Sequence, residues 1–189
     1  MIYQIGDGID KAAAQQTTSH KNGSEMKKIR RSKIIPENSL VLNGFKKVID
    51  YCDIYQVQKE TEKSAEEISR EIMQMPKWAS ILFKIRNRIV GVFGLKTDKN
   101  TAKTDNFFSV IENLENEIVM GEVDKHLDFR VSILKNNTEK TISVTTIVHF
   151  NNIWGNIYFF PVKPFHKIII KTMMKRYLKN CASKNERIS

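Results

Sequence analysis

The spacing of apolar side chains along the chain predicts strands and helices in a definite order. Residues 49–57 are rich in β-branched and aromatic side chains and predict a first strand. Ser64 followed by Glu67 forms a capping box, in which the hydroxyl accepts from a free backbone N–H and the carboxylate reaches back, so a short helix is expected after it. Pro76 suits the first position of a second helix, which apolar residues at helical spacing extend to about Ile89. One strand followed by two short helices is therefore expected.

From Phe107 onward the period of the apolar positions changes from 3.6 to 2, which is typical of strands. Five successive strands are predicted, at 108–111, 117–120, 127–133, 142–150 and 153–160. The polar connection at 135–139 and the pair Asn151-Asn152 are typical of hairpins, so neighbouring strands are expected to pair antiparallel.

Helical spacing returns after Pro161 and Pro164, which are expected to close the last strand and open a helix from Phe165 to about Asn180. One side of this helix carries an apolar stripe of Ile170, Met173, Met174, Tyr177 and Leu178, and the opposite side carries Lys167, Lys171, Lys175 and Lys179. The stripe needs a surface to cover it, and the sheet offers one. The predicted fold is α+β: a curved antiparallel sheet of about six strands around a long C-terminal helix, with two short helices after the first strand.

Charge and composition change this picture only at the ends of the chain. The composition is 41% hydrophobic and 28% charged, which is ordinary for a globular protein. Residues 1–33 carry a net charge of +4 and residues 161–189 carry +7, whereas the 127 residues between them carry −1. We expect a disordered basic leader at 1–33, the folded domain at 34–182 and a flexible tail at 183–189. A sheet that is close to neutral predicts no nucleic-acid partner, although the basic ends allow weak binding to an anionic surface.

Several classes of protein are disfavoured by what the chain does not contain. It has no run of eighteen apolar residues, so no integral membrane segment is expected, and its first 25 residues lack the apolar core of a secretory signal. Cys52 and Cys181 are far apart and have no metal-ligand spacing, which favours a reducing cytoplasm. No motif indicates a cofactor or a metal, and no catalytic residue is assigned.

The predicted order of elements resembles the helix-grip fold of the START and birch-pollen-allergen (SRPBCC) superfamily. Several ordered motifs are also similar to the bacterial family known as domain of unknown function 2867, over roughly residues 46–180: Pro76-Lys-Trp78, Ile85-Arg-Asn87 with Phe93-Gly-Leu95, Asp124 to Arg130, Thr146-Ile-Val-His149 and Pro164-Phe-His166. The resemblance implies a small-molecule cavity between the sheet and the last helix. It supplies no catalytic residues.

The segment from His126 to Arg130 is the strongest candidate for a binding site. As a strand it places Asp128 and Arg130 on one side, where they either form a solvated outer face or line the cavity. In a cavity, Asp128 could orient His126, and Arg130 could hold an anionic group.

Five further residues complete the candidate ligand site. His149 ends the following strand and could approach His126, and His166 lies in the first turn of the last helix. Trp78, Arg86 and Trp154 could reach the mouth of the cavity or its lining. A small apolar or amphipathic ligand is the leading hypothesis. The alternatives are a cyclase or hydratase that uses the polar groups, and a protein that binds anionic surfaces.

Overall fold

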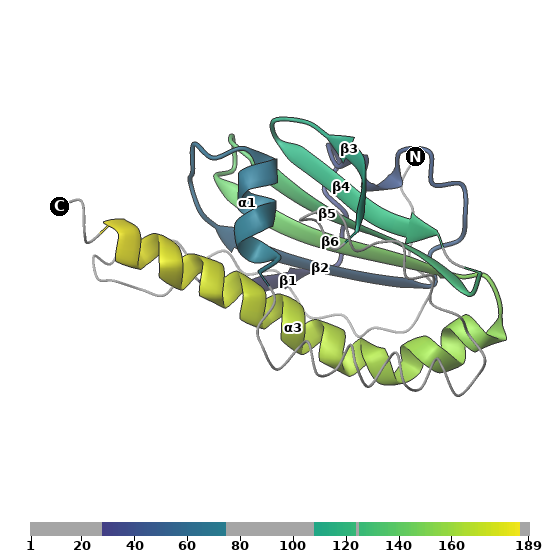
Figure 1. Ribbon diagram of the computed structural model, residues 1–189. Coiled ribbons are helices and arrows are strands. Elements are labelled where there is room, and N and C mark those ends of the chain that lie inside the picture. The colour runs from purple at the N-terminus through teal and green to yellow at the C-terminus, as the bar shows by residue number, and fades with distance from the viewer. Residues whose placement is uncertain (1–27, 75–107, 124, 186–189) are drawn as a thin grey trace.

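A six-stranded antiparallel sheet with its two described α-helices on one face makes up the described part of the protein (Figure 1). The structure is a computed structural model and describes residues 28–74, 108–123 and 125–185. The strands are β1 (Arg30–Ser32), β2 (Tyr51–Gln58), β3 (Ser109–Asn113), β4 (Glu117–Val123), β5 (Leu127–Asn136) and β6 (Thr141–Phe150). They lie in the order β1-β2-β6-β5-β4-β3. The described helices are α1 (Ala65–Ile72), α3 (Ile153–Asn185) and the short 3-10 helix η1 (Leu40–Leu42). The predicted fold class is confirmed.

Both α1 and α3 pack on the same face of the sheet, which we call the helix-side face (Figure 1). Strand alternation turns the odd-numbered residues of β2 and β5 and the even-numbered residues of β6 and β4 toward this face. The larger core cluster fills the space under α1 and the C-terminal half of α3, with Tyr55, Val57, Ala65, Ile68, Ile72, Ile118, Met120, Val131, Ile133, Ile142, Val144, Ile170, Met173, Met174 and Tyr177. The smaller core cluster, under the N-terminal half of α3, consists of Tyr51, Leu127, Val148 and Phe159. The apolar stripe predicted for the last helix is therefore buried against the sheet.

The opposite face of the sheet, which we call the outer face, is covered by the chain between β1 and β2. Val41, within η1, is fully buried there. The buried Glu117 carboxylate accepts hydrogen bonds from Ser39 Oγ (2.6 Å) and the Leu40 backbone N–H (2.7 Å). It also accepts a hydrogen bond from Ser132 on the adjacent strand. This carboxylate links the covering segment to two strands.

The capping box predicted at the start of the first helix is confirmed. Ser64 is the N-cap of α1: its hydroxyl accepts from the Glu67 backbone N–H, and the Glu67 carboxylate accepts from the Ser64 N–H. The second helix predicted from Pro76 lies outside the described residues.

The prediction that the disordered leader extends to residue 33 is wrong at its C-terminal end. Residues Arg30 to Ser32 form β1, which pairs antiparallel with β2. A long-range ion pair also joins the two strands, because Arg31 Nε donates to Asp53 Oδ1 at 3.0 Å. The sheet thus reaches six strands through β1 and not through residues 153–160.

The strand predicted at 153–160 is also wrong, because α3 begins at Ile153. Asn152 starts the helix: its side-chain oxygen accepts from the Gly155 backbone N–H at 3.2 Å, and its amide group donates to the Lys125 carbonyl. Asn151-Asn152 is therefore a helix start and not a hairpin. Almost every side chain from Ile153 to Phe160 is apolar, so the period of the segment distinguishes a strand from a helix poorly.

Pro161 and Pro164 lie inside α3 and do not separate a strand from a helix, contrary to the prediction. A proline in a helix has no N–H to donate to the carbonyl four residues earlier, and its ring crowds that carbonyl. Figure 1 shows that α3 is bent and follows the sheet as a curved rod. A bend is the usual accommodation of proline in a long helix, and here it lets one helix cover both core clusters.

Candidate functional site

A buried carboxylate on the helix-side face is the centre of the candidate site. Asp53 lies in the middle of β2, and its side chain is fully buried. The Tyr51 hydroxyl donates to Asp53 Oδ2 at 2.8 Å, and Arg31 Nε donates to Oδ1 at 3.0 Å. From α3, His166 brings its Nδ1 to 3.8 Å from Asp53 Oδ2. Three elements, β1, β2 and α3, thus converge on one carboxylate.

The surroundings of Asp53 keep it ionised. Burial alone would raise the pKa of this carboxyl, but contacts with His166 and Tyr51 and the charge of Arg31 outweigh burial and lower the pKa to about 2. The pKa of the Tyr51 hydroxyl is raised, first by burial and then by its hydrogen bond to the Asp53 carboxylate. The site therefore holds a permanent negative charge next to a neutral phenol.

Two buried polar atoms near Asp53 have no hydrogen-bond partner within the described residues, namely His166 Nδ1 and the Tyr55 hydroxyl. Burial, with a further contribution from the Asp53 charge, raises the pKa of Tyr55 to about 12, so its hydroxyl keeps its proton. Buried polar groups are hydrogen-bonded in the large majority of cases. Another molecule could therefore form hydrogen bonds with these two atoms beside Asp53.

Asp53 also lies at the boundary between the two core clusters. Tyr51 belongs to the smaller cluster and Tyr55 to the larger one, and Asp53 is between them on the same side of β2. The ammonium groups of Lys163 and Lys171, both on α3, lie 5.3 and 5.6 Å from the centres of the Tyr51 and Tyr55 rings. The polar site is thus flanked by apolar surface on both sides and edged by flexible lysine side chains.

The structure gives Asp128 a partner on the outer face, away from α3. Its buried carboxylate forms an ion pair with Lys47 and accepts from the Asn151 side chain at 2.9 Å. His149 is its direct neighbour across the β5–β6 pairing. The Asp128 carboxylate thus ties the covering segment to the end of β6.

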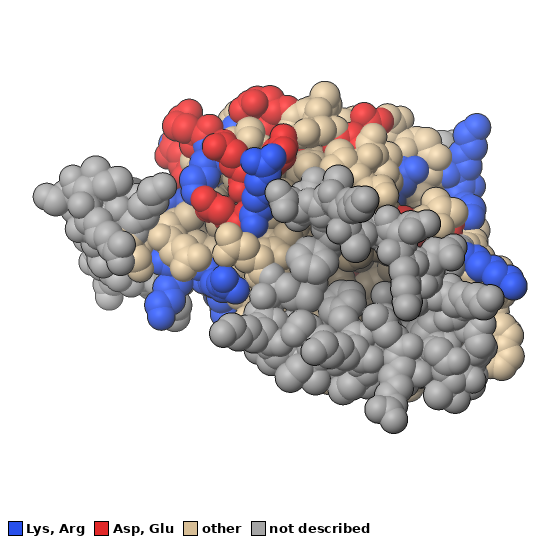
Figure 2. Space-filling view, viewed as in Figure 1, with Lys and Arg blue, Asp and Glu red and all other residues tan. Residues whose placement is uncertain are grey.

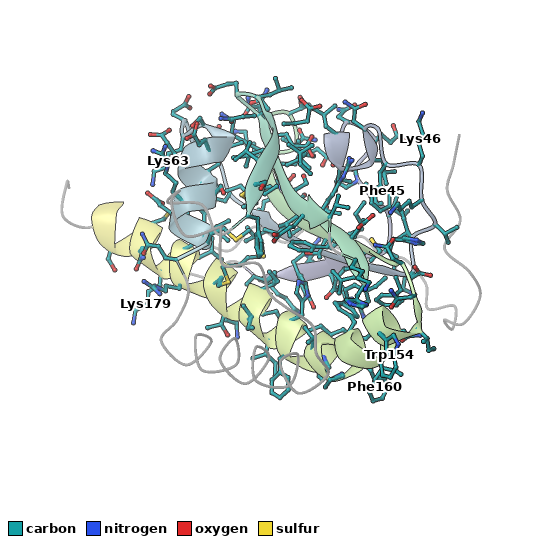
Figure 3. All side chains as sticks on the ribbon, turned by 45° about the vertical axis from the view of Figure 1, so that its right-hand side comes forward. Phe45, Lys46, Lys63, Trp154, Phe160 and Lys179 are labelled. Atoms are coloured by element: carbon teal, nitrogen blue, oxygen red, sulfur yellow. The ribbon has the colours of Figure 1, made fainter. Side chains whose placement is uncertain are left out.

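Arg130 also faces the outer side and holds the covering segment. Its guanidinium donates to the backbone carbonyls of Val41 (3.3 Å) and Asn43, and it lies 5.1 Å from the centre of the Phe45 ring. Figure 3 shows Phe45 on the side of the sheet away from α3. In the described structure the hydrogen bonds of Arg130 go to backbone carbonyls.

The two predicted strand histidines are held apart by different partners. His126 Nδ1 lies 3.1 Å from Asn152 Oδ1, beside the start of α3. His149 Nδ1 lies 2.9 Å from both the Val48 carbonyl and Asp50 Oδ2. Among the predicted histidines and charged residues that the structure describes, only His166 lies beside Asp53. Trp154 is half exposed on α3 (Figure 3), whereas Trp78 and Arg86 lie outside the described residues.

The comparison with protein families gives one result. A family model described as "Protein of unknown function (DUF2867)" matches residues 46–173. The chain belongs to this family. The matched part of the DUF2867 domain contains Asp53, Tyr51, Tyr55 and His166, but not Arg31 of β1. No curated protein and no solved structure was found to match the chain.

Sequence reasoning missed the centre of this site in the DUF2867 domain. Strand alternation puts Asp53 on the same side of the first predicted strand as Tyr51 and Tyr55. A carboxylate between two aromatic residues on an apolar strand face was the available signal, because such a group needs buried partners. Its partners, Arg31 and His166, are 22 and 113 positions away in the chain, so only the fold reveals them.

Other kinds of site find little support among the described residues of the DUF2867 domain. No group of three or more metal-ligating side chains occurs in this part of the chain. None of its helices is long and apolar enough to cross a membrane. A hollow of about 260 Å³ lies near the β5–β6 turn, with Lys59, Glu62 and Lys135 among its walls. It is lined by polar and charged side chains, so the apolar cavity expected between sheet and helix stays a prediction.

Replacing Asp53 by asparagine is expected to lower the free energy of unfolding by about 2 kcal/mol at pH 7. Because the folded-state pKa of about 2 lies below the ordinary value of 3.8, the carboxylate stabilises the fold above pH 4. This contribution is lost as the pH falls from about 4 toward 2. Urea unfolding of the wild type and of Asp53→Asn at several pH values should therefore show a difference that shrinks with acid.

The matched control is Asp50→Asn, because Asp50 also contacts a histidine but is one-third exposed. Its effect is expected to stay below about 1 kcal/mol. A stability loss for Asp53→Asn that is the same at pH 7 and pH 2 would contradict the assigned role of the Asp53 charge.

Proposed function

We propose that the DUF2867 domain binds a small amphipathic molecule between β2 and α3, with the polar group of that molecule at His166 and Tyr55. The observation that carries the proposal is the pair of buried polar atoms beside Asp53 that have no hydrogen-bond partner within the described residues. Leaving such an atom unpaired costs about 1–3 kcal/mol, so a molecule that pairs with both atoms gains a corresponding advantage on binding.

The chemistry of the site narrows the class of molecule. Asp53 is ionised and its charge is already met by Arg31 and Tyr51, so an anionic head group is disfavoured. The Tyr55 hydroxyl can donate a hydrogen bond to the ligand, and His166 Nδ1 can donate or accept one according to its tautomer. A hydroxyl or amino group on the ligand can form both hydrogen bonds. The apolar remainder of the molecule would pack between the two core clusters.

We infer that a ligand enters the site past two lysine side chains of α3. Lys163 and Lys171 are exposed, and their ammonium groups lie over the Tyr51 and Tyr55 rings. Lysine side chains change rotamer readily, so their movement would uncover the ring faces that they now lie over. The α+β layout is consistent with the helix-grip arrangement, and we infer that the domain belongs to that superfamily.

The enzymatic alternative has less support. It needs His126, Asp128, Arg130 and His149 to meet in one pocket, whereas their hydrogen bonds go to Asn152, to Lys47, to backbone carbonyls and to Asp50. These partners hold the covering segment and the start of α3, which is a structural role.

We also infer a reducing, cytoplasmic location, because both cysteines are free thiols. Burial and the nearby Asp53 charge raise the pKa of Cys52 to about 11, which keeps this thiol protonated and poorly reactive. Fractionation of the source cells would test the location, and recovery outside the cytoplasm would contradict it.

The binding proposal is tested by screening hydrophobic alcohols, hydrophobic amines and lipids with thermal shift and native mass spectrometry. We expect at least one of these classes to raise the melting temperature and to remain bound in the gas phase. Tyr55→Phe removes only the unpaired hydroxyl, so the ligand-free variant should be as stable as the wild type or slightly more stable. Its affinity for the ligand should fall about tenfold.

His166→Ala has a matched control in His149→Ala, because the two side chains are similarly exposed, at 18% and 22%, and each lies beside an aspartate. Only His166→Ala should weaken binding. The absence of any ligand across these three classes would overturn the proposed function. A ligand that binds Tyr55→Phe and His166→Ala as tightly as the wild type would overturn the proposed site.

A further inference from the structure

Helix α3 carries a second apolar surface, which faces away from the sheet. The stripe predicted for this helix accounts only for the side buried on the sheet. The exposed side carries six large apolar residues in the first half of the helix: Ile153, Trp154, Ile157, Phe160, Phe165 and Ile168. We call this set the outward stripe. Together these side chains expose on the order of several hundred Å² of apolar surface, which marks an interaction site more often than an ordinary surface.

The outward stripe continues into a row of lysines. Ile153, Ile157, Phe160, Pro164 and Ile168 follow one another by three or four residues, and Lys171, Lys175 and Lys179 extend the same series. All three lysines are exposed. In Figure 3 Phe160 and Lys179 both lie on the side of α3 away from the sheet, near opposite ends of the helix. One line along the helix is thus apolar in its first half and basic in its second.

The charges of the whole helix have one sign. Its 33 residues include no aspartate or glutamate, and seven are lysine or arginine. Figure 2 shows basic side chains beside the C-terminal half of α3 and acidic side chains gathered over α1, the helix that packs next to it. The first turn of α1 contains Glu66 and Glu67. An anionic partner would therefore be attracted by α3 and repelled by α1, so it would contact the side of α3 that faces away from the sheet.

We propose that the outward stripe and its lysine row bind the surface of an anionic lipid bilayer. The helix would lie in the plane of the interface, with Ile157 and Phe160 inserted among the acyl chains and Lys175 and Lys179 at the headgroups. An amphipathic helix that carries both apolar and lysine side chains binds a bilayer surface in two ways. Its apolar side chains are buried among the lipids, and its lysines are attracted to the anionic headgroups. This binding is distinct from the small-molecule site, because Ile157, Phe160, Lys175 and Lys179 are not among the residues of that site, although Lys171 of the row lies over the Tyr55 ring.

The charge of the helix selects this partner over a second copy of the chain. Pairing two copies through α3 would bring together two helices with seven basic side chains each and no acidic ones. An anionic bilayer instead supplies negative charge for the lysine row and hydrocarbon for the apolar half. It matches both halves of the surface at once.

The test measures co-flotation of the full chain with vesicles of phosphatidylcholine alone and with vesicles containing about 30% phosphatidylserine. We expect binding to the mixed vesicles, with an affinity that falls as salt rises because exposed charges are screened. Ile157→Glu combined with Phe160→Glu should reduce the affinity at least tenfold. Lys175→Ala combined with Lys179→Ala should reduce it roughly fivefold for each lysine at low salt.

Ile34→Glu combined with Leu114→Glu is the matched control for the apolar half. Leu114 and Ile34 are 55% and 76% exposed, close to the 51% and 79% of Ile157 and Phe160, but they lie outside α3, before β4 and after β1. This control should bind vesicles as the wild type does and should be as stable.

Three outcomes would overturn the proposal. The first is no wild-type binding to mixed vesicles, or equal binding by the Ile157→Glu, Phe160→Glu variant. The second is a dimer in light scattering that this variant dissociates, which would assign the stripe to a second copy. The third is a melting temperature that drops in this variant and not in the control, which would show that other residues of the chain cover the stripe.

Discussion

Replacing Glu117 by alanine is expected to lower the free energy of unfolding by about 3 kcal/mol. The buried carboxylate accepts from Ser39 Oγ, from the Leu40 backbone N–H and from Ser132 Oγ, and alanine leaves all three donors without an acceptor. The variant also avoids the cost of burying the carboxylate, which offsets part of this effect. The loss of stability therefore stays below the sum of three hydrogen bonds. Urea unfolding followed by circular dichroism measures it.

A second measurement separates this role from a general loss of packing. Hydrogen exchange should rise most in residues 36–45, because Glu117 fixes the covering segment to the sheet. Glu122→Ala, on an exposed position of the same strand, should change stability by less than about 0.5 kcal/mol. A loss of under about 1 kcal/mol for Glu117→Ala, or exchange that is unchanged over the covering segment, would contradict this account.

Gly155→Ala is expected to destabilise the protein by about 2–4 kcal/mol, although alanine is the better helix former by about 1 kcal/mol. A Cβ at Gly155 would lie 2.1 Å from the carbonyl oxygen of His126 and 3.0 Å from its carbon. That carbonyl accepts from the Asn151 backbone N–H at 2.9 Å and cannot move aside without breaking this hydrogen bond. The start of α3 would have to shift away from the start of β5.

The adjacent residue supplies the control for helix propensity. Asn156 is exposed in the same turn, so Asn156→Ala should be neutral or should stabilise by a few tenths of a kcal/mol. Thermal and urea unfolding measure the stability of both variants against the wild type. A Gly155→Ala protein as stable as the wild type would mean that the close approach of α3 and β5 is not required.

Strands and helices whose apolar side chains recur at a clear spacing could be predicted from the sequence. The strands β2, β4, β5 and β6 have alternating or β-branched sequences, and the capping box at Ser64 marks the start of α1. The stripe that includes Ile170 and Met174 has a strict helical period and is buried as expected. These predictions held because local pattern and tertiary environment favour the same structure.

The segment from Ile153 to Phe160 was predicted wrongly because both faces of this helix are apolar. One face packs on the smaller core cluster through Phe159, and the other forms the outward stripe. A helix that is apolar on all sides has no polar face to reveal its period. The hydrogen bonds that start the helix join Asn152 to Lys125 and to Gly155. The first of them forms only because β5 and β6 place Lys125 beside Asn152 in the fold.

The sequence by itself determined the class of fold, the antiparallel pairing of β3 to β6 in succession and the buried side of the last helix, because periods of 2 and 3.6 are local properties. Only the tertiary structure decided which polar residues meet. Arg31 and His166 reach Asp53 from opposite ends of the chain, whereas the sequence favoured Asp128 and Arg130, which instead hold the covering segment on the outer face. Partners of a buried charge are chosen by the three-dimensional packing that desolvates it, and no local pattern records that choice.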